Sequence, residues 1–168
     1  MTLSIVVTLS SVVLAGQPNG TDTAAAFERM HALQGSWKGT YAWTGARSDS
    51  GAMDVTYRLS GAGSALIEDL IVDGNPSMTT VYHLDGSDLR MTHYCAAKNQ
   101  PRLKAGSIDL TGNVYRFDFV DITNLRTPDA PHVHGFTMHI VDPDHLQLEF
   151  TFTAKGKESI EHITLTRA

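Results

Sequence analysis

The sequence predicts an all-β fold: an antiparallel up-and-down barrel of about ten strands with a short N-terminal helix. After Gly35, apolar and polar residues alternate with period two in long runs, the pattern of strands with one buried face. Turns rich in Gly, Asp and Asn separate these runs at short intervals, which favours a meander. Before Gly35, the period is helical instead.

Composition limits the classes of function. The 168 residues are 42% hydrophobic and 18% charged, which indicates one folded domain rather than a disordered or membrane-embedded chain. The formal net charge is −5 and no Lys/Arg cluster is present, so we expect no nucleic-acid partner. The single cysteine, Cys95, excludes an internal disulfide.

The first residues resemble an export signal. Residues 3–15 form an apolar run, too short to span a membrane and ending in a small-residue cleavage pattern. We expect a signal peptide at 1–15, a linker at 16–21 and the barrel domain at 22–168, giving an exported, periplasmic or extracellular protein with no membrane span after cleavage. The run lacks a preceding positive charge, so a first strand or a different start is the alternative.

The helix is expected to begin at a cap on Asp22 or Thr23 and to continue through Gln34. Ala26, Met30 and Leu33 form its apolar stripe, and Gly35 ends it. Strands are expected near residues 37–44, 53–59, 64–72, 78–84, 89–95, 105–110, 115–119, 136–140, 146–153 and 159–167. Residues 121–131 form the longest irregular loop.

The opening of the barrel resembles that of the calycin superfamily, which includes lipocalins and fatty-acid-binding proteins. Residues 33–39, Leu-Gln-Gly-Ser-Trp-Lys-Gly, look like its Gly-x-Trp stretch after a short helix. The resemblance implies that a basic residue of the last strand packs over Trp37 and closes one barrel end. Arg167 is placed for that role.

More closely, the chain resembles an uncharacterised bacterial family of exported lipocalin-like proteins, at residues 63–68, 82–86, 91–102 and 142–145. That family implies the fold and no activity. A looser likeness is to nitrobindins, ten-stranded haem-binding barrels whose haem-ligating His lies near the C-terminus. His162 has a comparable position, but if Arg167 points to the barrel end, alternation puts His162 on the outer face.

Histidines raise the prospect of a metal site. His132 and His134 are two residues apart and are expected to share a strand face with Phe136. With His93 as a third donor and Glu68 as a carboxylate, they would suit zinc or another divalent metal. The alternative is that both histidines lie at the solvated start of the strand.

Other polar residues are candidates for a ligand site in the barrel interior. His93 and Cys95 share a face, but two positions along a strand is too far for a ready nucleophile–base hydrogen bond. Either Glu68 or Asp69 must face inward among apolar residues and needs a partner, with Arg102 or Arg58 available. The candidate ligand-binding residues are therefore His93, Glu68, Arg102, Tyr57, Tyr82 and Cys95.

Three readings of function remain open. The first is an exported barrel that binds a small apolar or amphipathic molecule, with no cofactor expected. The second is a metal- or haem-binding barrel, enzymatic or not, that uses the histidines. The third is a barrel filled by its own side chains. Neither the ligand nor the oligomeric state follows from the sequence.

Overall fold

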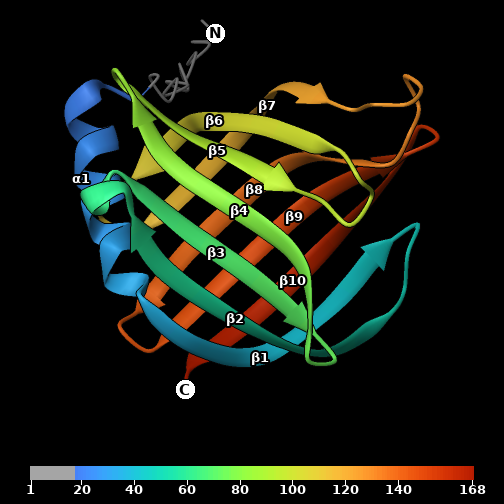
Figure 1. The fold of residues 1–168 in the computed structure, drawn as a ribbon, viewed down its shortest axis with the longest axis horizontal. Coiled ribbons are helices and arrows are strands. Elements are labelled where there is room, and N and C mark those ends of the chain that lie inside the picture. Colours follow the sequence, from blue (N-terminus) through green and yellow to red (C-terminus); the bar gives the residue numbers. More distant parts are fainter. Residues whose placement is uncertain (1–17) are drawn as a thin grey trace, which may run out of the picture.

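The computed structural model describes residues 18–168, and the predicted signal peptide at 1–15 lies outside them. Ten antiparallel strands follow one another around a closed barrel, and the last pairs with the first, which confirms the predicted fold class (Figure 1). The strands are β1 (Gly35–Gly45), β2 (Ser50–Ser60), β3 (Ala65–Val72), β4 (Asn75–Asp85), β5 (Asp88–Tyr94), β6 (Gln100–Asp109), β7 (Val114–Thr123), β8 (His132–Asp142), β9 (His145–Ala154) and β10 (Lys157–Arg167). Within the described residues, no helix has the length and apolar character needed to cross a bilayer.

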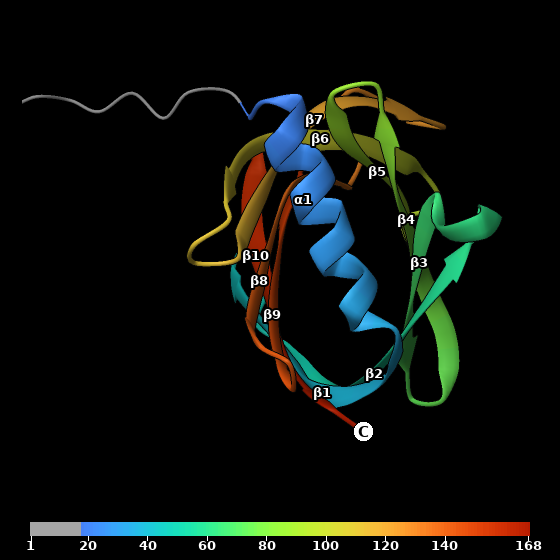
Figure 2. The ribbon, with the colours of Figure 1, turned by 90° about the vertical axis from the view of Figure 1, so that its left-hand side faces the viewer.

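One helix, α1 (Gly20–Met30), lies across one opening of the barrel (Figure 2). Asn19, rather than Asp22 or Thr23, is its cap, because the Asn19 side-chain oxygen accepts the free amides of residues 21 and 22. A 3₁₀ turn at His31–Leu33 replaces the last predicted helical turn. The predicted stripe of Ala26, Met30 and Leu33 is fully buried against the barrel.

Trp37 and Arg167 complete this closed end. The Trp37 ring has no exposed surface and its N–H donates to the Leu33 carbonyl over 2.8 Å. The Arg167 guanidinium carbon lies 4.3 Å from the ring centroid, and its nitrogens donate to the carbonyls of Ala32, Gln34 and Pro143. The contact implied by the calycin resemblance is therefore present, and it joins β1, β10, the β8–β9 turn and the segment after α1.

Several strands are longer than the sequence predicts, most of all those around β6 and β8. β6 begins at Gln100, so residues 100–102 belong to the sheet and pair with the end of β7, although the strand was expected to begin near residue 105. β7 runs to Thr123, which shortens the loop expected at 121–131, and β8 begins at His132, directly after that loop. Both errors have one cause: bulges in β6–β7 and β8–β9 interrupt the alternation by one residue, and a strict period of two misses the extension.

Candidate functional site

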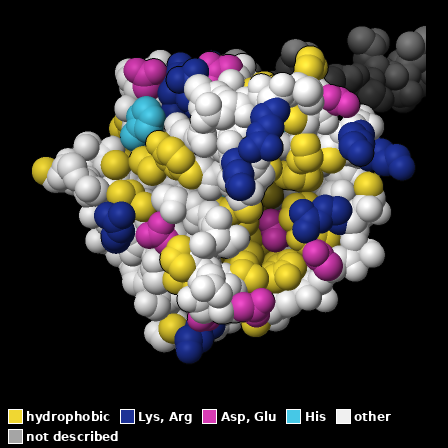
Figure 3. Space-filling view, turned by 45° about the vertical axis from the view of Figure 1, so that its right-hand side comes forward, with side chains coloured by type: hydrophobic (Ala, Val, Ile, Leu, Met, Phe, Trp, Pro, Cys, Tyr) yellow, Lys and Arg dark blue, Asp and Glu magenta, His cyan; other side chains and the backbone are white. Residues whose placement is uncertain are grey.

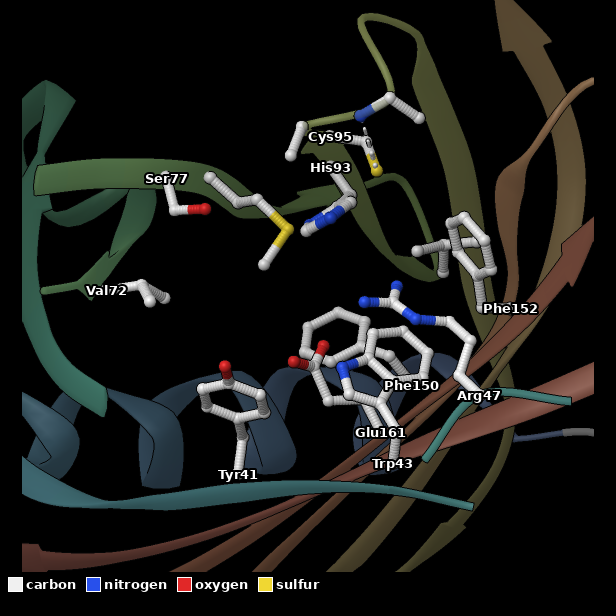
Figure 4. Close-up of a pocket in the computed structure, with 14 residues that line it drawn as sticks. Tyr41, Trp43, Arg47, Val72, Ser77, His93, Cys95, Phe150, Phe152 and Glu161 are labelled. Carbon is white, nitrogen blue, oxygen red and sulfur yellow. Dashed lines mark hydrogen bonds between the residues drawn. The ribbon is translucent and has the colours of Figure 1, made fainter. Parts of the chain in front are cut away.

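A cavity of about 230 Å³ opens at the barrel end opposite α1. Figure 4 shows side chains from both sides of the barrel pointing into it, and Figure 3 shows a hollow lined by hydrophobic groups with an acidic side chain inside. The walls are mainly aromatic or aliphatic. Among the polar lining residues, His93 carries an imidazole, Arg47 a guanidinium and Glu161 a carboxyl group. The aromatic walls are Tyr41, Trp43, Phe150 and Phe152.

His93 is the deepest polar group of the cavity. It lies on β5, has no exposed surface, and its ring centroid is 5.0 Å from that of Phe150. Nδ1 is hydrogen-bonded to the Thr80 hydroxyl over 2.9 Å, and Nε2 has no partner among the described residues. Burial lowers the pKa of His93 to about 4, so the imidazole is neutral near pH 7.

A row of polar side chains continues from His93 into the barrel. Tyr57, Glu68, Thr80 and His93 are direct cross-strand partners on β2, β3, β4 and β5, and all four are buried. Because side chains directly opposite one another in adjacent strands lie about 5 Å apart, this register brings the four groups into contact. The row crosses four strands and ends at the cavity.

Glu68 is satisfied by phenols rather than by a cation. Tyr57 donates to one carboxyl oxygen over 2.5 Å and Tyr82 to the other over 2.9 Å. Desolvation raises the pKa of Glu68, and the hydrogen bonds from the two tyrosines and Thr80 act against this rise. Neither arginine considered from the sequence is its partner. Arg58 lies on the outer face, 3.9 Å from Asp69.

Trp43, Arg47 and Glu161 form the outer wall of the cavity. Trp43 on β1 and Glu161 on β10 are cross-strand partners, and Arg47 belongs to the turn after β1. The Arg47 guanidinium carbon lies 3.6 Å above the Trp43 ring centroid and 5.9 Å from that of Phe152. In Figure 4 the guanidinium reaches over the aromatic rings toward the cavity.

Glu161 is a second buried acid. Its residue is 5% exposed, and desolvation raises the pKa of its carboxyl to about 7, although the charge of Arg47 acts in the opposite direction. The sequence could have located it. Since Ile163 and Leu165 face the interior, alternation along β10 places Glu161 inside as well.

Cys95 also borders the cavity but has no base beside it. Its sulfur accepts from the Ala97 amide over 3.5 Å, and burial raises the pKa of the thiol. A protonated, hydrogen-bonded thiol is a poor nucleophile, which agrees with the expectation that Cys95 and His93 form no catalytic pair.

Arg102 lies away from the cavity. It projects from the outer face of β6 and forms a bidentate salt bridge with the Asp121 carboxylate of β7. Half of the Arg102 side chain is exposed. The sequence analysis placed Arg102 among the candidate ligand-binding residues of the barrel interior. Instead, residue 101 faces inward as part of β6 and residue 102 faces out.

The three histidines considered for a metal do not converge. The bulge in β8 puts Val133, not its neighbours, against the cavity, so His132 and His134 lie on the other face beside Phe119. The expected shared face with Phe136 is therefore wrong. Among the described residues, no group of three or more His, Cys, Asp or Glu side chains is arranged to hold a metal ion.

His162 lies on the outer face of β10, as alternation predicts. Nδ1 contacts Glu149 of β9 over 3.0 Å and Nε2 contacts the Thr44 hydroxyl over 3.1 Å. Both ring nitrogens are engaged there, on the side of the sheet away from the cavity.

Comparisons with known proteins support the fold. No protein-family model matches the chain, and no curated protein matches its sequence. Among solved structures, the protein Rv2717c from M. tuberculosis has a TM-score of 0.60 with 18% identity, over 85% of this chain and 97% of that one. A protein of unknown function from the DUF3598 family of Nostoc punctiforme has a TM-score of 0.55 with 14% identity, over 82% of this chain.

Both likenesses concern the barrel alone. This chain spans 48% of the length of the DUF3598 protein, so the rest of that protein has no counterpart here. At these identities a shared barrel does not imply a shared ligand, because barrels of one topology serve many functions.

Proposed function

We propose that this protein binds one small organic molecule in the open end of a lipocalin-like barrel, with His93 as the polar anchor. The observation that supports this most directly is His93, a residue of the cavity lining whose Nε2 is buried and has no partner among the described residues. A buried polar nitrogen left without a partner costs about 1–3 kcal/mol. A ligand atom in the cavity would remove that cost.

The cavity volume limits the ligand. An apolar cavity of about 150 Å³ holds one benzene molecule. About 230 Å³ therefore suits a body of one ring with a few further atoms, in contact with the aromatic walls. This supports a ligand site over a barrel filled by its own side chains.

The neutral state of His93 favours binding over catalysis. With a pKa of about 4, the imidazole is a weak base near neutral pH. It serves a ligand through a hydrogen bond, and Thr80 holds its orientation. Export to the periplasm or exterior remains part of the proposal. It is tested by the mass of the protein recovered after expression with its native start.

The test is a titration of isotope-labelled protein with single-ring compounds, monitored by two-dimensional NMR. We expect amide shifts confined to residues around the cavity, and binding about tenfold weaker in His93→Leu. His83→Leu, on the outer face of β4, is the matched control and should bind as the wild type does. If no compound shifts the cavity residues, the proposed function is wrong.

A further inference from the structure

The cavity holds one acidic and one basic side chain, and the two are anchored differently. Glu161 lies in the middle of β10, with Trp43 of β1 and Phe150 of β9 as its cross-strand partners. It is 5% exposed, and its backbone is paired on both sides. Its carboxyl cannot leave the cavity without breaking the barrel.

Arg47, in contrast, is attached to the exposed surface of the barrel rather than to a strand interior. It lies on the exposed turn between β1 and β2, its side chain is 42% exposed, and its ion pair is with Asp49 of the same turn, over 3.2 Å. An exposed pair of this kind contributes about 0–1 kcal/mol. The guanidinium can therefore move into water without disturbing a strand, so Glu161 is the acid fixed in the cavity and Arg47 the base that can leave it.

The guanidinium occupies a place suited to a cation. It lies over the face of Trp43 and near Phe152, and these two rings meet edge to face with centroids 5.7 Å apart. Aromatic faces attract cations electrostatically, more strongly where water is excluded. Glu161 lies next to this place, and the charge of Arg47 stabilises its ionised form.

We propose that the cavity takes a small organic cation, an ammonium group on a body of about one ring, which displaces Arg47 from Trp43 and pairs with Glu161. The inference rests on the proposed function and specifies the ligand charge. An anionic ligand would instead use Arg47 as its anchor. Removal of Arg47 therefore distinguishes the two signs of charge, since it strengthens cation binding and weakens anion binding.

The experiment compares three single-ring probes of similar size: benzylammonium, benzyl alcohol and benzoate. Affinities are measured by NMR titration above pH 7, where Glu161 is ionised. We expect benzylammonium to bind at least about tenfold more tightly than benzyl alcohol, the effect of one charge-assisted hydrogen bond.

Two variants separate the roles of the charges. Arg47→Ala should tighten benzylammonium binding by about two- to fivefold at a pH where Glu161 stays ionised in the variant, because the competing cation is gone. Glu161→Gln should remove the preference for benzylammonium over benzyl alcohol. Arg58→Ala and Glu149→Gln change the same charges on the outer face and should have no effect on either preference.

Other outcomes overturn the inference in distinguishable ways. Tightest binding of benzoate, lost in Arg47→Ala, would show an anion site and leave the proposed function standing. Equal binding of benzylammonium and benzyl alcohol would show that the cavity does not distinguish a cationic from a neutral ligand. Absence of binding by all three probes to a folded wild-type protein would overturn the proposed function as well.

Discussion

The two tryptophans of β1 lie at opposite ends of the barrel, and each has an arginine over its ring. At the closed end, Arg167 is tied to three backbone carbonyls, and Trp37 is fully buried. At the open end, Arg47 is tied only to the exposed Asp49, and Trp43 is partly exposed. The same pair of side chains thus stabilises the fold at one end and covers a cavity at the other. The difference lies in the hydrogen-bond partners of the two guanidinium groups: backbone carbonyls for Arg167 and an exposed side chain for Arg47.

The largest expected effect tests this comparison directly. Trp37→Ala should lower the free energy of unfolding by about 3–5 kcal/mol, because it leaves a large void under Arg167. Trp43→Ala is the matched variant at the open end, where solvent already reaches the ring, and should cost much less. Urea unfolding monitored by circular dichroism measures both. Equal losses would contradict the assignment of a structural and a functional end.

The next effect is a pH dependence that arises from two groups at the open end, Glu161 and His93. The folded-state pKa of Glu161 is raised from 4.5 to about 7, so its contribution to stability is present below pH 4.5 and is lost as the pH rises through 7. The pKa of His93 is lowered from 6.5 to about 4, so its contribution is present above pH 6.5 and is lost as the pH falls through 4. The two dependences oppose each other over most of the same range.

In Glu161→Gln, the pH dependence of stability caused by His93 should no longer be offset by Glu161. Relative to the wild type, the variant should lose up to about 3 kcal/mol of stability as the pH falls from 7 to 4.5. Urea unfolding at a series of pH values measures this, with Glu158→Gln, an exposed acid of the same strand, as the control. Wild-type and Glu161→Gln curves that run parallel would show that Glu161 titrates normally.

A smaller loss is expected between the two ends. Tyr57→Phe removes a 2.5 Å donor from buried Glu68 and should cost about 1–3 kcal/mol. Tyr41→Phe, which alters a phenol at the open cavity, is the comparison and should change stability little. Thermal unfolding measures both variants. Equal losses of stability would show that the row of Tyr57, Glu68, Thr80 and His93 does not stabilise the fold.

The smallest expected change is at His93. His93→Leu removes a buried nitrogen that has no partner but also the hydrogen bond to buried Thr80, so the two effects offset each other and stability should change by no more than about 1 kcal/mol, while ligand binding falls. Loss of binding with little loss of stability is characteristic of a functional group. A loss of several kcal/mol in thermal unfolding would instead make His93 a structural residue.

The sequence predicts the ten strands well because they depend on local patterns. Alternation along β10 places Ile163, Leu165 and Arg167 on one side and His162 on the other, with no knowledge of neighbouring strands. The contact of Arg167 with Trp37 at the closed end was expected for a different reason: the calycin resemblance of the Gly-x-Trp stretch implies it.

The open end is predicted less well because it depends on register and on a turn. The bulge in β8 moves His132 and His134 to the outer face, and it is defined by the pairing of β8 with β9, which the sequence of β8 alone does not give. The phenol partners of Glu68 follow from how β2, β3 and β4 align. Arg47 reaches the cavity from an irregular turn, where periodicity carries no information. Glu161 could have been found from alternation alone.

The pairing of β10 with β1 has a consequence for how the chain folds. These are the first and last strands, so the barrel closes through contacts between nearly opposite ends of the described chain. Such distant contacts form slowly, and until they form β1 and β10 each expose a row of unpaired backbone groups. Self-association through these edges competes with closure, so refolding yield should fall with protein concentration more steeply in variants that weaken the Trp37–Arg167 contact.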